Sequence, residues 1–489
     1  MAEKIQDGSM GKTGFIQEHD LYTSDQKSRA QELIALIDQR QLKTIRIAWP
    51  DQHGILRGKH ISAKDFSSVL RNGIDFQTAT LFMDTSNALI APIFEAKAGL
   101  NFTELAGGPD SVLVPDPLTF KILPWADSTG WCLSEMYLSE GKPCPFDSRL
   151  ILRNSLKELN ALGFDYLSGL EVEFYITKLE DAKLRPEEAG YPPDPPEVTV
   201  IAHGFQYLTD DRQDEITHLL DPLRDQLELL GLPLRTMEDE WGPGQCEFTF
   251  DPRRGIGSAD DMVLFRSAVK QICRRRGYHA TFMTRPALPN FFSSGWHLHQ
   301  SLVDLQDGKN LFASTDGQTV TDLCRHFVGG LLKHAAAGSI FATPTINGYK
   351  RFRPNSFAPD RITWAVENRG AMLRIVGGGD DPATHIENRA GEPCANPYLY
   401  MASQIVAGLD GIASSIDPGE PDLAPYESQN QLLPRSLMEA RDALSSDVFF
   451  RNKFGERFID YMLALKRSEI DRFLSHVTDW EQREYFEVY

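Results

Sequence analysis

Three short segments of the chain each carry two polar residues at positions i and i+2 of an apolar stretch: Glu171 and Glu173, His297 and His299, and Glu387 and Arg389. They read Leu170-Glu-Val-Glu-Phe174, Trp296-His-Leu-His-Gln300 and His385-Ile-Glu-Asn-Arg389. In a β-strand, residues i and i+2 point to the same face, so the two polar side chains of each segment project together. Each segment therefore predicts a strand with one apolar, buried face and one face that gathers charged groups.

The gathered carboxylates favour a metal site. Two acids side by side on one strand face repel each other unless a positive group lies between them. A further stretch, Glu240-Trp-Gly-Pro-Gly-Gln-Cys-Glu247, flanks a turn with two more acids. Taken singly, each pattern is typical of a solvated strand face or turn. Together they suit two hard divalent cations, and histidine is tolerated better by Mn²⁺ than by Mg²⁺. The candidate ligands are Glu171, Glu173, Glu240, Glu247, Glu387 and His297.

A cluster of arginines follows within about forty residues. The segments are Gly348-Tyr-Lys-Arg-Phe-Arg-Pro354, Glu367-Asn-Arg-Gly370, Met372-Leu-Arg374 and Arg389. Any single arginine of this kind is typical of a surface salt bridge. Beside a metal site, however, the guanidinium fork suits bidentate binding of phosphate and carboxylate. Metal ligands and arginines together predict phosphoryl transfer, in which the protein mainly positions groups and neutralises charge.

The composition excludes several other classes. The chain has 50 basic and 69 acidic residues, a net charge of −19 and a pI near 5.1. This balance argues against nucleic-acid and anionic-membrane partners, which need a basic surface. We find no transmembrane run, no secretory signal in the polar N-terminus and no GxxxxGK[ST] loop. The six cysteines are scattered without CxxC pairing, which predicts reduced thiols in a cytoplasmic protein.

The remaining pattern predicts two unequal domains of an α+β protein. We expect a flexible leader over residues 1–24, a small β-rich domain over 25–140 and one large domain over 141–489. Hydrophobic periodicity and turn residues predict the following elements. They are helices over 24–41, 148–161 and 258–277, a hairpin over 43–61, strands around 166–176, 279–283, 297–303 and 371–376, and a mostly helical last ninety residues.

The order of these motifs resembles that of the glutamine synthetase family. Leu-Glu-Val-Glu-Phe is followed by the two acids around Gly-Pro-Gly-Gln, then by the His-x-His strand and by Tyr349-Lys-Arg351. Asn368-Arg-Gly370, Ile386-Glu-Asn-Arg389 and Ala395-Asn-Pro-Tyr-Leu399 complete the series. Seven motifs in this order run from about residue 43 to the C-terminus.

The resemblance implies a role for each candidate residue. Glu173, Glu240 and Glu247 would hold one metal ion, while Glu171, His297 and Glu387 would hold the second, with two to three Mg²⁺ or Mn²⁺ ions in all. His299 and Ser301 would face the phosphates of ATP. Arg369 and Arg374 would bind the phosphates, and Arg369 would act catalytically with Arg351 and Arg389. These last two, with Gly295, would bind glutamate.

The resemblance also implies a fold, an assembly and a reaction. The fold would be a β-grasp N-terminal domain followed by a catalytic domain with a curved antiparallel sheet and helices. Family members form ring-shaped homo-oligomers, often dodecamers, with active sites between subunits. ATP phosphorylates the γ-carboxylate of glutamate, and an amine then displaces phosphate.

The chain departs from glutamine synthetases where ammonium would bind. The flap reads Pro354-Asn-Ser-Phe-Ala-Pro359, so Phe357 occupies the position of an acid. In the N-terminal segment, alignment on Phe76 places Gln77 where a second acid is expected, although a shift of two residues restores Asp75. A carboxylate there would bind a cation and accept its proton. Phe357 and Gln77 therefore predict an organic amine, best a hydrophobic or aromatic amine such as aniline, in place of ammonium.

A second departure concerns the acid substrate. Phe292 and Ser293 replace an Asn-Gly pair that touches glutamate in many relatives, which weakens the assignment of glutamate. Several alternatives therefore stay open. They are a glutamine synthetase that uses ammonium, a γ-glutamyl-alkylamine or putrescine synthetase, and a non-enzymatic structural homologue.

Overall fold

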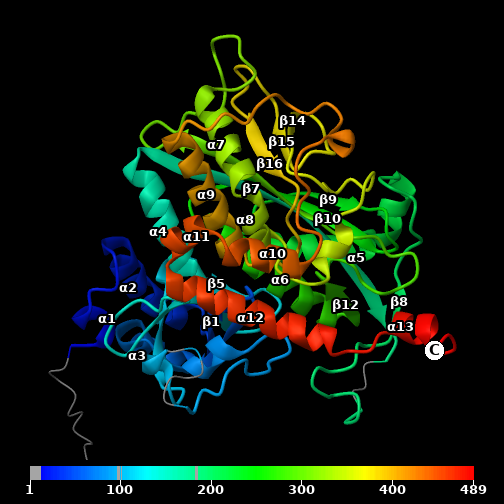
Figure 1. Ribbon diagram of the computed structural model, residues 1–489. Helices are drawn as coiled ribbons and strands as arrows, with labels where there is room; N and C mark the ends of the chain where they lie inside the picture. The colour runs from blue at the N-terminus through cyan, green and yellow to red at the C-terminus, as the bar shows by residue number, and fades with distance from the viewer. Residues whose placement is uncertain (1–12, 96–99, 101, 182–184) are drawn as a thin grey trace, which may run out of the picture.

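The computed structural model describes residues 13–95, 100, 102–181 and 185–489. It contains two β-sheets surrounded by helices (Figure 1). The helices are α1 Phe15–Glu18, α2 Ser24–Gln39, α3 Phe66–Asn72, α4 Ser148–Ala161, α5 Asp210–Leu229, α6 Gly257–Arg275, α7 Asp322–Lys333, α8 Ala335–Ala342, α9 Pro397–Ala413, α10 Leu437–Ser445, α11 Val448–Phe454, α12 Glu456–Leu474 and α13 Asp479–Tyr485. No helix in the described part of the chain is both long and apolar enough to cross a membrane.

The N-terminal sheet is formed by six strands in the order β2-β1-β6-β4-β3, with β5 paired to β6. The strands are β1 Thr44–Pro50, β2 Leu56–Ser62, β3 Ile74–Gln77, β4 Asp110–Pro115, β5 Lys121–Ile122 and β6 Thr129–Tyr137. The predicted hairpin is the antiparallel pair β1–β2, and β1 also pairs parallel to β6. Of the predicted leader, the described part forms α1 and buries Ile16 and Tyr22.

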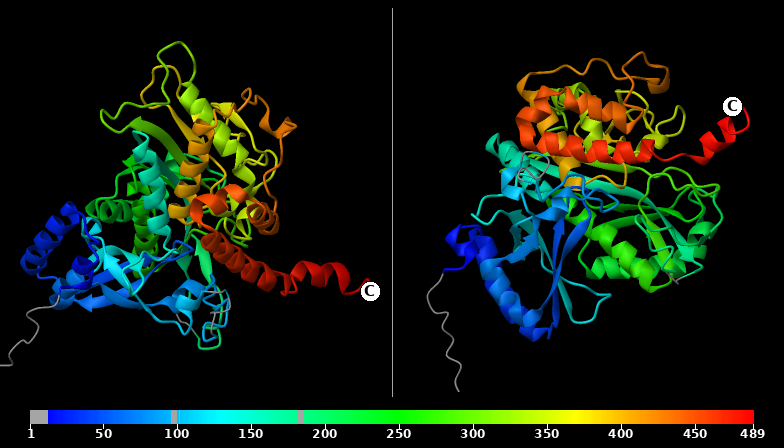
Figure 2. Two further views of the ribbon diagram at one scale, coloured as in Figure 1. Left: turned by 60° about the vertical axis from the view of Figure 1, so that its left-hand side comes forward. Right: turned by 60° about the horizontal axis from the view of Figure 1, so that its bottom comes forward.

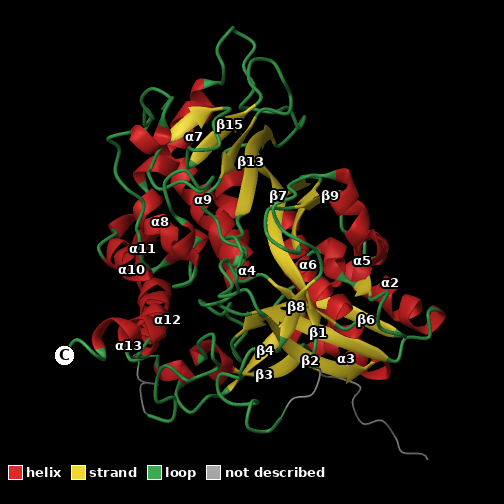
Figure 3. Ribbon diagram, turned by 90° about the vertical axis from the view of Figure 1, so that its right-hand side faces the viewer, coloured by secondary structure: helices red, strands yellow, loops and turns green. Residues whose placement is uncertain are grey.

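The larger sheet is formed by ten strands in the order β14-β15-β16-β13-β7-β10-β9, and β8, β11 and β12 also pair with β7. Its strands are β7 Phe164–Leu179, β8 Val198–Val200, β9 Leu234–Asp239, β10 Gln245–Phe250, β11 Arg253–Arg254, β12 Tyr278–Thr281, β13 Trp296–Asp304, β14 Trp364–Val366, β15 Leu373–Val376 and β16 His385–Asn388. All pairings are antiparallel except the parallel pair β14–β15 at one edge. Figure 3 shows the long strand β7 running through this sheet toward the N-terminal sheet. The structure confirms the α+β class.

The apolar alternation of β7 explains why its polar residues share one face. Val172, Phe174 and Ile176 are fully buried in the larger of the two main hydrophobic cores, together with Met262 and Phe265 of α6. Because alternate residues point to opposite faces, the same packing directs Glu171 and Glu173 away from this core. The core thus fixes the face on which the charged groups gather.

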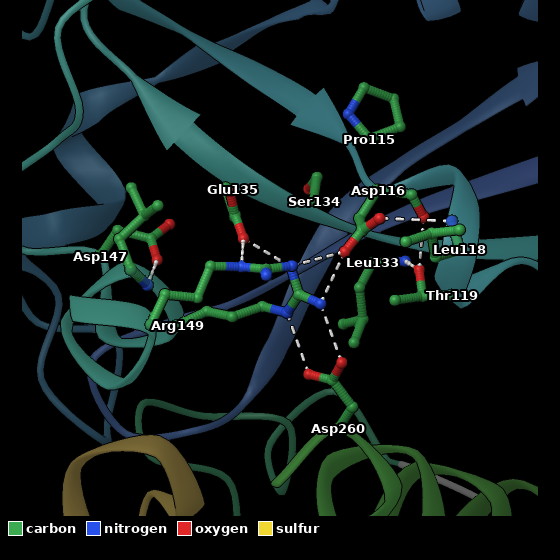
Figure 4. A network of polar contacts seen from close by, with 12 residues as sticks. Pro115, Asp116, Leu118, Thr119, Leu133, Ser134, Glu135, Asp147, Arg149 and Asp260 are labelled. Atoms are coloured by element: carbon green, nitrogen blue, oxygen red, sulfur yellow. Dashed lines mark hydrogen bonds and ion pairs between the residues drawn. The ribbon is translucent and has the colours of Figure 1, made fainter. Parts of the chain in front are cut away.

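Helices α4 and α6 are joined to the N-terminal unit by a buried ion-pair network around Arg149, near the start of α4 (Figure 4). Arg149 is almost completely buried and pairs with Asp116 and Glu135 of the N-terminal unit at 2.8 and 2.6 Å. Its guanidinium also forms two bonds to Asp260 of α6, at 2.9 and 2.8 Å. Removing one partner from such a network leaves an uncompensated buried charge, which typically costs about 3–5 kcal/mol. The network therefore fixes α4 and α6 against the N-terminal sheet.

The C-terminal helices also contact the N-terminal unit. α12 contributes Phe458 and Tyr461 to the second hydrophobic core, and the Tyr461 hydroxyl donates to the backbone oxygen of Leu81 at 2.6 Å. α12 continues into α13, which extends away from the body of the molecule (Figure 2). The prediction of a mostly helical C-terminal segment agrees with these elements.

Candidate active site

The charged residues form adjacent rows across the larger sheet. The first row contains Glu238 of β9, Glu247 of β10 and Glu173 of β7, which lie opposite one another. In the next row Glu171 of β7 lies opposite His297 of β13. Directly opposed residues of antiparallel strands project to the same face, so the register brings these groups together.

The third row joins β13, β16 and β15. His299 lies opposite Glu387, and Glu387 in turn lies opposite Arg374. The Arg374 guanidinium donates to the Glu387 carboxylate at 3.0 Å and to Glu367 at 2.5 Å. All three predicted polar strand segments therefore meet on one face of one sheet, although they are separated by more than 80 residues along the chain.

Two groups of side chains have the spacing of a metal site. Their potential ligand atoms lie within 4.8 Å of one another, and the groups are Glu171 with Glu247 and His297, and Glu171 with His299 and Glu387. Glu171 is shared, because its two oxygens lie 2.5 Å from His297 Nδ1 and 3.0 Å from His299 Nε2. Carboxylate oxygens with imidazole nitrogens form a donor set that fits Mg²⁺ or, with more histidine, Mn²⁺.

The carboxylates lie in an electrostatic environment that favours bound cations. Burial, and then the neighbouring Glu171, Glu173 and Glu240, raise the pKa of Glu247 to about 11. Burial and the adjacent Glu173 raise the pKa of Glu240 to about 8. These raised pKa values mean that both groups mainly keep their protons at neutral pH without a cation, and a divalent cation would take the place of those protons. His297, whose pKa burial and Arg389 lower to about 4, stays neutral and can donate a lone pair to a metal.

Gln245 fixes the orientation of Glu173, and the sequence did not single it out. This buried side chain donates from Nε2 to the Glu173 carboxylate at 2.8 Å. Its Oε1 accepts from the Tyr175 hydroxyl at 3.1 Å and from the backbone of Gly242 at 2.9 Å. The sequence offered one sign of this role, because Gln245 lies between the two acids Glu240 and Glu247.

His385 was also not singled out from the sequence. Its Nε2 lies 2.8 Å from His299 Nδ1.

Arg351 and Arg389 lie beside these carboxylates in the interior. Arg351 donates to the backbone oxygens of Arg389 and Gly391 at 2.9 and 3.2 Å, and its Nη2 lies 3.3 Å from His297 Nε2. Gly295 makes this approach possible, because a Cβ there would lie 2.5 Å from Arg351 Nη2. Arg389 pairs with Glu387 and donates to the backbone oxygen of Phe357 at 3.2 Å.

One donor of Arg389 remains for a ligand. Its Nε is buried and has no hydrogen-bond partner among the residues that the structure describes. A buried guanidinium nitrogen without a partner is costly, and a carboxylate oxygen would satisfy it. Together with Arg351 and Gly295, Arg389 can therefore hold an anionic substrate next to the metal-ligand groups.

A cleft of about 360 Å³ opens beside the third row. Its walls include Glu171, His299, Ser301 and Arg374, which contribute a potential metal ligand, an imidazole, a hydroxyl and a cation. Phe250, Pro252, Val376 and Pro382 add apolar surface. The volume and the mixture of apolar wall and converging polar groups are typical of a small-molecule site. Arg369, in contrast, is exposed between β14 and β15 and outside the lining of this cleft.

The two residues predicted to face the amine lie on different units of the chain. Phe357 belongs to the loop after Gly348–Arg351, has a φ of 57° and exposes 65% of its surface. Gln77 ends β3, the edge strand of the N-terminal sheet, and is also exposed.

Comparison with known proteins identifies the family of this chain. Residues 145–485 match the family model of the glutamine synthetase catalytic domain. A γ-glutamylanilide synthase from an Acinetobacter species is 45% identical over 98% of this chain and 99% of its own. A glutamine synthetase from Methanosarcina mazei is 31% identical over 94% of this chain and 98% of its own. The γ-glutamylethanolamide synthetase GlnA4 of Streptomyces coelicolor is 30% identical over 94% of this chain and 95% of its own.

Comparison with solved structures shows the same fold. A solved structure described as a GmaS/ADP complex superimposes with a TM-score of 0.78 and 25% identity, covering 93% of this chain and 99% of its own. The family model covers well over half of the chain, and the sequence relatives match nearly all of it. The chain therefore belongs to the glutamine synthetase family, and it is an ATP-dependent ligase that joins an acid to an amine.

Proposed function

We propose that this enzyme joins the γ-carboxylate of L-glutamate to an organic amine, best a hydrophobic or aromatic amine such as aniline. The reaction proceeds through γ-glutamyl phosphate and releases ADP and phosphate. The 45% identity to a γ-glutamylanilide synthase over the full length supports this substrate class. The observation that carries the proposal is Phe357, an apolar residue at the flap position where ammonium-using relatives carry an acid.

The proposed residue roles follow the three groups of the site. Two to three Mg²⁺ or Mn²⁺ ions bind the carboxylate and histidine groups, and they would neutralise charge on the transferred phosphoryl group. The proposed ligands are Glu171, Glu173, Glu240, Glu247, His297 and Glu387. Of these, Glu171, Glu247, His297 and Glu387 belong to the two groups with metal-site spacing, and His299 belongs to one of these groups as well. ATP occupies the cleft lined by Ser301 and Arg374, with its phosphates toward His299.

The substrate glutamate is proposed to lie between this cleft and the arginines. Arg351 and Arg389 bind its carboxylates, which would satisfy the buried Arg389 Nε. Fixing the γ-carboxylate oxygen next to ATP supplies most of what phosphoryl transfer requires, because positioning and electrostatics dominate its catalysis. Arg369, on the exposed turn after β14, approaches the transferred phosphoryl when the substrates are bound.

The amine must reach the acyl carbon as a free base. An aromatic amine is largely neutral at pH 7, so it needs no carboxylate to accept a proton before attack. Phe357 offers apolar surface at the flap, and the bond from Arg389 Nη2 fixes its backbone next to the proposed glutamate site. Ammonia, in contrast, is mainly ammonium at this pH. With Phe357 in place of the acid, the flap has no carboxylate at this position to bind that cation and accept its proton.

Restoring that acid should change the preferred amine. We expect Phe357→Glu to raise kcat/KM for ammonium about tenfold or more and to lower it for aniline, because one carboxylate in a half-exposed site stabilises a cation by about 1–2 kcal/mol. Phosphate release with glutamate, MgATP and each amine measures both values. Phe357→Leu is the matched control and should keep the wild-type preference. A wild-type enzyme that turns over ammonium as fast as any organic amine would contradict the proposal.

The assembly and location are proposed on the same basis. Gln77 can help to form an amine site with Phe357 if a neighbouring subunit brings its N-terminal sheet to the flap. We therefore propose a ring-shaped homo-oligomer, up to a dodecamer, with active sites between subunits. All six cysteines are unpaired, which supports a reducing, cytoplasmic location.

A further inference from the structure

Four exposed aromatic side chains gather next to the metal-ligand groups. We call them the aromatic patch, and they are Phe205, Tyr207, Trp241 and Phe292, exposed by 55%, 44%, 41% and 38%. Tyr207 stacks on Trp241 with ring centres 5.4 Å apart, and Phe205 meets Phe292 edge to face at 5.5 Å. Trp241 and Phe292 lie 6.5 Å apart and link the two pairs. Three separate loops thus contribute to one aromatic surface.

The first two loops are fixed to Glu240, one of the proposed metal ligands. Trp241 follows Glu240 directly, and its backbone N–H donates to the Glu240 carboxylate at 3.2 Å. The backbone N–H of Phe205 donates to the backbone oxygen of Trp241 at 2.8 Å. The patch therefore borders the site where the acyl phosphate would form.

The third loop is fixed to Glu173. The backbone N–H of Phe292 donates to the Tyr175 hydroxyl at 2.7 Å, and Tyr175 donates to Gln245 at 3.1 Å. Gln245 then binds the Glu173 carboxylate at 2.8 Å. The loop of Trp241 packs against the same tyrosine, and a Cβ at Gly242 would lie only 1.9 Å from its hydroxyl. These contacts hold the aromatic rings in a fixed relation to the reaction centre.

The chemistry of this surface fits one kind of ligand. Exposing aromatic rings to water is unfavourable. A single exposed ring needs no explanation, but a contiguous group of exposed apolar side chains is typical of a binding site. The patch presents ring faces and edges, the partners that another aromatic ring prefers. A neutral aromatic amine would bury its ring against the patch. Its nitrogen would then point toward the carboxylates and lie at the acyl carbon that it attacks.

We propose that the aromatic patch binds the ring of an arylamine substrate and so determines the preference for aromatic over aliphatic amines. This inference rests on the proposed function, in which an organic amine attacks γ-glutamyl phosphate. It assigns the selectivity to Phe205, Tyr207, Trp241 and Phe292 in addition to the flap residue Phe357. The amine nitrogen lies toward Glu240 and Glu173, and the ring lies toward solvent.

Steady-state kinetics with two amines tests the patch. In Trp241→Leu, the ratio of kcat/KM for aniline to that for ethylamine should fall about tenfold, because lost ring stacking and apolar contact affect only the aromatic amine. The loss should lie mainly in KM for aniline, and KM for glutamate should change by less than about twofold. Trp241→Phe should restore most of the ratio. Trp480→Leu, which removes an exposed tryptophan of α13, is the matched control and should leave the ratio unchanged.

Direct binding separates this inference from the proposed function. Aniline is titrated calorimetrically into the wild type and into Trp241→Leu, each with MgADP and glutamate, so that no turnover occurs. Weaker binding to the variant supports the patch even if ammonium proves to be the preferred nucleophile, in which case only the proposed function fails. Three results would overturn the proposal for the patch. They are equal affinity of both proteins for aniline, no binding of aniline to the wild type, and an equal loss of kcat/KM for aniline and for ethylamine in Trp241→Leu. An altered oligomeric state of Trp241→Leu with loss of both activities would assign the patch to a subunit contact instead.

Discussion

Glu247→Gln is expected to lower kcat on the order of 10²–10³-fold while the protein keeps its fold. Glu247 lies opposite Glu173 in the sheet and belongs to one of the two groups with metal-site spacing. Losing one anionic ligand weakens the bound cation and the charge stabilisation that it provides to phosphoryl transfer, which is worth several kcal/mol. Glutamine has the shape of the protonated carboxyl, and burial and neighbouring acids already favour that form by raising the pKa of Glu247 to about 11.

The stability of the variant distinguishes a ligand from a structural residue. In metal-free buffer, Glu247→Gln should melt close to the wild-type temperature, because glutamine replaces a carboxyl group whose raised pKa already keeps it protonated. The increase in Tm on adding Mn²⁺ should be much smaller than in the wild type. Glu180→Gln changes an exposed acid just after the end of β7 and is the matched control with no expected effect. A wild-type Mn²⁺ shift in Glu247→Gln would rule out its role as a ligand.

Arg389→Lys is expected to lower kcat/KM for glutamate about 10²-fold. Arg389 uses one nitrogen for Glu387 and one for the Phe357 backbone, and its buried Nε is left for a substrate carboxylate. Lysine keeps the charge but has a single nitrogen, which cannot serve three directions at once. Hydrogen bonds of a charged group contribute about 1.5–3 kcal/mol, which corresponds to this loss.

Initial rates at varied glutamate and varied ATP locate the effect. We expect KM for glutamate to rise and KM for ATP to stay within about threefold of the wild-type value. Arg325→Lys is the matched control, because Arg325 forms an exposed pair with Asp417 on the surface. If instead KM for ATP rises and KM for glutamate does not, Arg389 binds the nucleotide and the proposed glutamate site is wrong.

Local sequence patterns predicted the strands of the site and the face on which their polar groups lie. The period-two alternation around Glu171, His297 and Glu387 follows from packing on the buried core, which is a local consequence of residue type. The register that places Glu247 opposite Glu173, and Glu171 opposite His297, could not be derived in this way. It depends on how strands distant in sequence pair, and only the resemblance to a family implied that they meet.

The residues that support the site were the hardest to predict. Gln245 acts through a buried network with Tyr175 and Glu173, and a glutamine in a strand carries no charge pattern that would reveal it. The aromatic patch was equally hidden, because Phe205, Trp241 and Phe292 come from three loops. The sequence singled out Phe292 only as a departure from the family pattern. Their proximity depends on backbone contacts between loops, which the tertiary structure determines.

Competition between two amines in one reaction tests the central claim most directly. The wild-type enzyme is given glutamate, MgATP and equal concentrations of aniline and ammonium, and both products are quantified by mass spectrometry. Glu247→Gln serves as the control for background and should form little of either product. We predict that γ-glutamylanilide forms in large excess over glutamine. Glutamine as the main product would contradict the claim that this member of the family has exchanged ammonium for an aromatic amine.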